Sequence, residues 1–231
     1  MYQLASGYAD ANDAQHLRRD PMFQLGLERR PLEAESDLAS APTCSRLEHQ
    51  MDRKDIYRLT RALVDHCIAS YAEPPAAMVL DVAHSDDPPY GQQEFACYNY
   101  PSQNHCYLPL FIFEGTSHAL VTAYRRPGTR PPGTENAMIL VRLLSYLRRH
   151  WPHTHILVRG DSHFATPEVS AVIAHRRWTD LVFGLAGNAV LLRQAAPTIK
   201  EARRLHHQRV ALARAQDQAP PTSRRLYDEF V

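Results

Sequence analysis

Residues 134–151 (TENAMILVRLLSYLRRHW) carry the most regular pattern in the chain, and this pattern restricts what can surround them. Their apolar side chains recur three or four residues apart and form one stripe of a helix: Leu140, Leu143, Leu144, Leu147 and Trp151. The basic residues at the end of this segment suit the negative end of a helix dipole. Short apolar runs lie on both sides of it, at 106–115 and 153–161. The pattern predicts an amphipathic helix packed against a sheet.

Strand signals precede this helix. Residues 78–82, 94–100 and 106–115 are short apolar or aromatic runs separated by turn residues. Three such runs joined by short loops predict an antiparallel meander.

Alternating strand and helix signals follow the helix. A buried strand is expected at 153–161, a helix from Thr166 to about Trp178 with Pro167 at its first position, and a last strand at 180–186. The expected order β-β-β-α-β-α-β is that of a ribonuclease H-like α/β core.

The chain divides into three parts by composition. Residues 1–72 read as helical, with Ser45 as the expected cap of one helix, and short helices with exposed arginines suit a partial DNA-binding region. A Pro-rich stretch at 72–77 marks the boundary to a core at 73–190. Residues 191–231 read as the helical and polar start of a C-terminal part.

Basic residues are unusual in kind rather than in number. The net charge is only +1, yet all 26 basic residues except Lys54 and Lys200 are arginines, many of them in adjacent pairs. Arginine forks match phosphate oxygens, which suits DNA contacts. Codon bias, with the pairs on solvated helix faces, explains them equally well.

The sequence contains no recognisable targeting signal and no cysteine motif typical of disulfide or zinc sites. The four cysteines have neither C-x-x-C nor zinc-finger spacing, which favours a reducing compartment. The first residues show no signal-peptide pattern, and the longest apolar run is too short to span a bilayer. We expect a cytoplasmic protein, associated with the nucleoid if it binds DNA.

Two carboxylates lie where a ribonuclease H-like sheet would bring them together. Asp81 interrupts the apolar strand at 78–82, and Asp161 ends the strand at 153–161. A carboxylate in an apolar strand is costly unless it is paired or binds a metal. Oxygen ligands suit Mg²⁺, and two such ions can activate water and stabilise a leaving oxygen in phosphodiester chemistry. From the pattern alone, a turn aspartate is the simpler reading of Asp161, because Asp-Ser is common in turns.

Several long segments together carry a family resemblance. They are YADANDAQHLRRDPMF (8–23), LASAPTCSRLEH (38–49), VLDVAHSDDPPYGQQEF (79–95), LPL (108–110), VTAYRRPGTRPPGTE (121–135), WPHTHILVRGDSHFATPEV (151–169) and VFGLAGNAVLL (182–192). The set resembles the IS1380-type transposases, bacterial insertion-sequence enzymes of the DDE class within the IS4-like group. The resemblance covers nearly the whole chain.

This resemblance implies a function and a site. It implies a ribonuclease H-like core, Mg²⁺ or Mn²⁺ as cofactor, and insertion-sequence ends and target DNA as partners. The implied reaction is metal-dependent strand cleavage followed by strand transfer, and a homodimer is the assembly expected of an intact relative. Asp161 matches the second catalytic carboxylate, in the family's R-[AG]-D-S-x-[FY] motif, and Asp81 is the candidate for the first. We therefore predict Asp81 and Asp161 as the catalytic and metal-binding residues.

The chain also departs from the family pattern. The first motif usually reads L-D-x-D-x-T, whereas this chain has Ala83 at the second aspartate and Ser85 at the threonine. Asp81 and position 83 share one face of a strand, and His84 is expected on the opposite face. The third carboxylate of the family, a glutamate, is expected beyond Val231. We interpret the chain as an internal fragment of a transposase, truncated and inactive.

Two alternatives stay open. One is a non-enzymatic DNA-binding or interaction protein derived from a transposase. The more remote one is a phosphatase of the haloacid-dehalogenase type, with Asp81 as nucleophile. That chemistry requires an acid two residues after the nucleophile, where this chain has Ala83.

Overall fold

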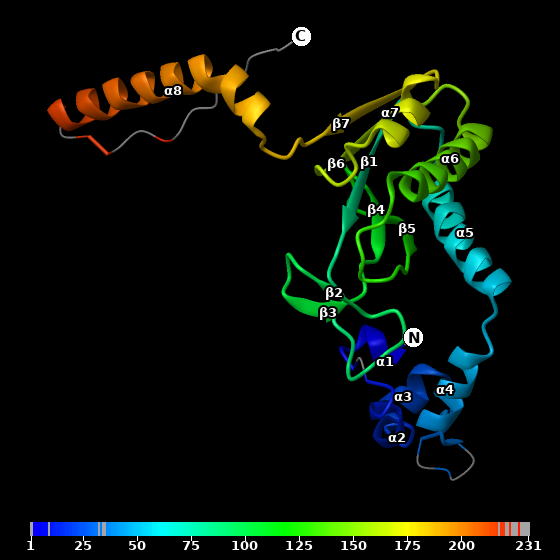
Figure 1. Ribbon diagram of the computed structural model, residues 1–231. Coiled ribbons are helices and arrows are strands. Elements are labelled where there is room, and N and C mark those ends of the chain that lie inside the picture. Colours follow the sequence, from blue (N-terminus) through cyan, green and yellow to red (C-terminus); the bar gives the residue numbers. More distant parts are fainter. Residues whose placement is uncertain are drawn as a thin grey trace.

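A five-stranded sheet forms the centre of the computed structural model (Figure 1), which describes residues 2–8, 10–31, 33, 36–216, 218–219, 222 and 226. The strand order is β5-β4-β1-β6-β7. The strands are β1 (Ala77–His84), β4 (Leu110–Glu114), β5 (Leu120–Tyr124), β6 (His155–Gly160) and β7 (Thr179–Phe183).

Strand directions confirm the ribonuclease H-like topology. β1 pairs antiparallel with β4, and β4 pairs antiparallel with β5. On its other side β1 pairs parallel with β6, and β6 pairs parallel with β7. The parallel strands are reached through α6 (Gly133–His150) and α7 (Pro167–Ala174). Three antiparallel strands followed by two parallel ones, with helices in the crossovers, are the predicted order.

Helices cover one face of this sheet. The core lies between the even-numbered residues of β1 and the helices α5 (Arg53–Ala69), α6 and α7. Leu80, Ile156 and Leu147 are completely buried there. The predicted amphipathic helix is confirmed as α6, whose apolar stripe faces the sheet. At α7, Pro167 occupies the first turn and the Thr166 hydroxyl accepts from the Val169 N–H, so the predicted start is also confirmed.

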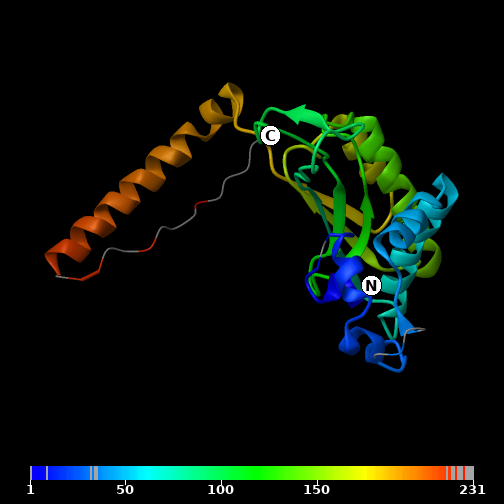
Figure 2. The same ribbon diagram turned by 90° about the horizontal axis from the view of Figure 1, so that it is seen from below.

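The opposite face of the sheet carries Asp81 and is open in the described part of the chain. Phe111 and Phe113 are only partly buried there, and Val182 is exposed. α8 (Ala189–Ala215) extends away from the sheet in both views (Figures 1 and 2). No helix among the described residues is long and apolar enough to cross a membrane.

The expected meander has a different set of strands. The segment 94–100 does not join the sheet, because β2 (Cys97–Asn99) and β3 (Asn104–Cys106) form a separate hairpin. The segment 106–115 is divided at Tyr107–Pro109, since Pro109 has no N–H to donate to a sheet. The third strand of the meander is β5, a strand not predicted from the sequence.

The N-terminal region is helical, as expected. It contains α1 (Tyr2–Ala5), α2 (Asp13–Leu17), α3 (Pro21–Gly26) and α4 (Ala41–His49) before α5. The prediction that Ser45 caps a helix is wrong. α4 already begins at Ala41 with Ser40 at the N-cap, because Pro42 favours the first turn. The domain boundaries after 72 and 190 stay predictions.

Candidate catalytic carboxylates

Asp81 lies in the middle of the sheet, opposite Arg159 of the parallel neighbour β6. Its two carboxylate oxygens accept from Arg159 Nε at 2.5 Å and Nη2 at 2.7 Å. This two-point geometry is the strong form of an arginine–carboxylate pair. The hydrogen bond and the charge of Asp81 raise the pKa of Arg159, which therefore stays charged. Asp81 is held by a guanidinium within the sheet.

Asp161 comes directly after β6, at the carboxyl end of that strand. One of its oxygens accepts from the His163 N–H at 2.8 Å, and the other lies 3.2 Å from His163 Nδ1. Its side chain is 57% exposed, against 27% for Asp81. Asp161 thus caps the turn that follows the strand and keeps access to solvent, so both sequence interpretations of this residue fit its position.

Ala83, and not Asp81, is the residue of β1 nearest in register to Asp161. The last pairs between the two strands are Asp81 with Arg159 and Val82 with Gly160, so the next step places Ala83 beside Asp161. Alternate residues of a strand share one face and lie about 6–7 Å apart along it. A carboxylate at 83 would therefore stand next to Asp161, whereas Asp81 is one such step further back.

The residues present do not fit a site for two Mg²⁺ ions. Mg²⁺ requires an octahedron of oxygens with one or more carboxylates. The Arg159 guanidinium occupies both oxygens of Asp81 and places a positive charge where a cation would bind. Within the described ranges, no three histidine, cysteine, aspartate or glutamate side chains are grouped so as to hold a metal. Asp81 and Asp161 as shared metal ligands stay a prediction.

His84 faces away from Asp81, as the alternation of strand residues predicts. Its ring stacks on Phe164, with ring centres 4.5 Å apart. Arg126 donates from Nη2 to His84 Nδ1. Burial, and then the charge of Arg126, lower the pKa of His84 from 6.5 to about 4. His84 is therefore a neutral hydrogen-bond acceptor at neutral pH.

This histidine makes the stability of the fold pH-dependent. Between about pH 6.5 and pH 4 the unfolded chain binds a proton at His84 that the folded chain does not, so stability falls as the pH falls through this window. We expect the free energy of unfolding to drop by at most about 3 kcal/mol on this account. Urea unfolding at pH 7 and pH 4.5 measures it. In His84→Gln, which keeps an acceptor but does not titrate, the drop should be smaller by that amount; equal drops in both proteins would contradict the assignment.

Some arginines of the adjacent pairs bind other parts of the protein, whereas others are free to contact solvent or DNA. Sequence alone does not reveal which are which. Arg126 is 5% exposed and also donates to the Leu108 carbonyl and the Asn136 side chain. Arg148 donates to backbone carbonyls of the turns around β6 and β7. Arg204 is paired with Glu201. The pair Arg224-Arg225 lies outside the described residues. The argument for DNA contacts therefore rests on fewer arginines than the sequence offers.

Comparisons with known proteins give one family match and several matches to solved structures. The family model described as "Transposase DDE domain group 1" matches residues 1–230. No curated protein matches the sequence. Among solved structures, a piggyBac transposase synaptic complex with hairpin DNA is 16% identical, with a TM-score of 0.38, over 77% of this chain and 39% of that one. A Mos1 transposase paired-end complex with the left transposon end is 11% identical, with a TM-score of 0.32, over 74% of this chain and 57% of that one. The chain spans 39% and 57% of the lengths of these two proteins.

Proposed function

The chain belongs to the Transposase DDE domain group 1 family, and from this premise we propose that it is an IS1380-type transposition protein that binds DNA but does not cleave it. Its partners would be insertion-sequence ends and target DNA. Asp81 and Asp161 are the descendants of the metal-binding carboxylates, and Mg²⁺ or Mn²⁺ is the ion that an intact relative would hold. An intact relative would act as a homodimer on DNA in the cytoplasm.

One observation carries the loss of cleavage. The position of β1 beside Asp161 is Ala83, and the nearest carboxylate on that strand is bound at both oxygens by Arg159. Metal-assisted phosphodiester cleavage depends on carboxylates that hold two ions about 4 Å apart, one at the attacking and one at the leaving oxygen. A single solvent-exposed Asp161 cannot position such a pair. What this chain retains is the sheet on which the site is built.

We expect no metal-dependent nicking of DNA by the purified protein. The measurement is conversion of supercoiled plasmid to open circles in the presence of Mg²⁺ or Mn²⁺, with Asp161→Ala as the matched control. Both proteins should leave the plasmid supercoiled. Nicking by the wild type that is lost in Asp161→Ala would overturn the proposed loss of cleavage.

DNA binding is the activity that should remain. We expect weak binding to duplex DNA that falls steeply with salt, because it depends on phosphate contacts and the release of counterions. Anisotropy titrations of a labelled duplex at several salt concentrations measure the slope. A protein that does not bind duplex DNA at low salt, or binds it independently of salt, would contradict this part of the proposal.

A non-enzymatic protein repurposed from a transposase is the alternative that shares these observations. The DNA around the gene distinguishes them, because a transposase gene lies between insertion-sequence ends and a repurposed gene does not. The phosphatase alternative is not supported, since Ala83 is where its acid would be.

A further inference from the structure

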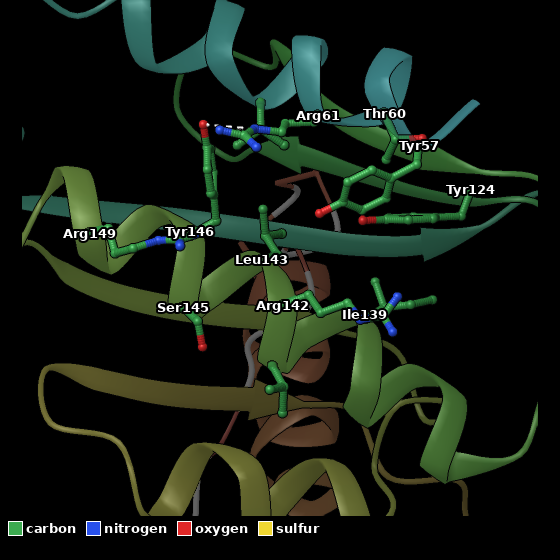
Figure 3. A pocket seen from close by; sticks show the side chains of 12 residues that line it. Tyr57, Thr60, Arg61, Tyr124, Ile139, Arg142, Leu143, Ser145, Tyr146 and Arg149 are labelled. Carbon is green, nitrogen blue, oxygen red and sulfur yellow. Dashed lines mark hydrogen bonds between the residues drawn. The ribbon is translucent and has the colours of Figure 1, made fainter. Parts of the chain in front are cut away.

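A groove lies between α5 and α6 on the helix-covered side of the sheet, away from Asp81 (Figure 3). It has a volume of about 510 Å³. This is within the usual range for pockets that bind small molecules. The nucleotide groove, as we name it here, is lined by side chains of three kinds. They are the tyrosines Tyr57, Tyr124 and Tyr146, the arginines Arg61, Arg142 and Arg149, and an apolar and small polar floor that includes Val64, Leu143, Thr60 and Ser145.

Aromatic rings form two sides of the nucleotide groove. Tyr57 and Tyr124 lie together at one side, Tyr146 stands at the other, and Leu143 lies between them (Figure 3). Leu143 is 3% exposed, so the floor is rigid core, whereas Tyr57 is 58% exposed and presents its ring to solvent. Tyr57 and Tyr124 therefore offer aromatic surface beside a buried apolar floor, on which a flat apolar group can stack.

Positive charge surrounds this aromatic slot. Arg61 lies over the Tyr146 ring at 4.8 Å and donates to its hydroxyl, while Asp65 accepts from the same hydroxyl. Arg149 lies over that ring at 5.0 Å. Within the described part of the chain, neither Arg142 nor Arg149 forms an ion pair with a carboxylate. The groove therefore holds three guanidinium groups against one nearby carboxylate, in a chain whose net charge is only +1.

We propose that the nucleotide groove binds one nucleotide of a single-stranded nucleic acid. The base stacks against Tyr57 and Tyr124 over Leu143. Arg142 and Arg149 lie about two helical turns apart on α6, so they pair with the phosphates on the two sides of that nucleotide. Stacking on aromatic side chains is tolerant of sequence, and arginine forks suit phosphate oxygens. An acidic peptide would use the arginines but leave the aromatic slot unfilled. The inference rests on the proposed function in that it adds a second DNA contact, on the opposite side of the sheet from the carboxylates.

The test uses a short, fluorescently labelled oligothymidylate and the full chain. We expect Arg142→Ala combined with Arg149→Ala to weaken binding at least about tenfold, and Tyr57→Ser to weaken it about tenfold, with Tyr57→Phe unchanged. Arg203→Ala combined with Arg214→Ala removes the same charge from exposed positions of α8 and should change binding less than about twofold. Thermal melts of each variant verify that the fold is intact. Equal weakening by both double variants would mean that only overall charge matters, and would overturn the site.

Two further ligands test what the groove recognises. An abasic oligonucleotide of the same length carries the phosphates without bases, and we expect it to bind about tenfold more weakly. Equal binding of the abasic strand, or equally strong competition by a short oligoglutamate, would overturn the assignment to a nucleotide. Titration with duplex DNA separates this inference from the proposed function. If the wild-type protein binds duplex but not the oligothymidylate, only the proposed role of the groove is wrong. If it binds the oligothymidylate but not duplex, only the proposed function is wrong.

Discussion

Arg148→Ala is expected to melt about 6–12 °C below the wild type, a loss of about 3 kcal/mol of unfolding free energy for a chain of this size. Arg148 Nη1 donates to the carbonyls of Trp151, Pro152 and Thr154, at 3.2, 3.1 and 2.7 Å. Its Nη2 donates to the Trp178 carbonyl at 3.0 Å and the Thr179 hydroxyl at 3.3 Å. One guanidinium therefore joins the end of α6 to the turns before β6 and β7. Removing it takes this donor from the partly buried carbonyls of Trp151 and Thr154 and from exposed carbonyls of both turns.

Arg149→Ala is the matched control for this prediction. Arg149 is the next residue on α6, is exposed, and lies over the Tyr146 ring, so its loss should change the unfolding free energy by less than about 0.5 kcal/mol. Arg148→Lys keeps the charge but lacks the fork, and should fall between the two. Thermal unfolding followed by circular dichroism gives all three values. If Arg148→Ala and Arg149→Ala have the same melting temperature, Arg148 does not stabilise these turns.

Ala83→Asp is expected to make the melting temperature depend on bound metal, which the wild type should not show. The new carboxylate would stand beside Asp161, so without metal the two like charges should lower the melting temperature. An ion bound only by the folded protein stabilises it by about 2.7 kcal/mol at one hundred times its dissociation constant. For a protein of this size, this is a rise of about 5–10 °C on adding Mn²⁺. The wild type should shift by less than about 1 °C under the same conditions.

Two controls separate a metal site from other effects of the substitution. Ala83→Asn has nearly the same shape without the charge, and Ala83→Asp combined with Asp161→Asn lacks one of the two ligands. Neither should gain the response to Mn²⁺. A wild-type protein already stabilised by Mn²⁺ through Asp161 would contradict the conclusion that its residues do not fit a metal site.

Features that depend on residues close together in the chain could be predicted from the sequence, whereas features that depend on contacts between distant residues could not. The stripe of α6 and the proline at the start of α7 depend on neighbours within one or two turns, so both could be predicted from local pattern. The segment 94–100 has the composition of a strand, and β2 is a strand, but its partner is β3 rather than β1. Which strands pair depends on contacts between distant residues, and local composition does not contain this information.

The same distinction applies to the arginines. Arg148 and Arg149 are adjacent and of the same type. Arg148 donates hydrogen bonds to the turn before β6, whereas Arg149 lines the groove. The helical period separates them by about 100°, and only the packing of α6 decides which of them meets the backbone of β7. The nucleotide groove was missed for this reason, because its arginines and tyrosines come from α5, β5 and α6.

By itself, the sequence determined the family motifs, the helices α6 and α7, and the presence of Ala83 where an aspartate is expected, since each of these is a property of residues close together along the chain. Only the tertiary structure decided the partners of the carboxylates. The parallel register of β1 and β6 sets Asp81 against Arg159 and Ala83 next to Asp161. Register is fixed by burying one face of the sheet under α5 and α6, so it depends on the packing of the whole core.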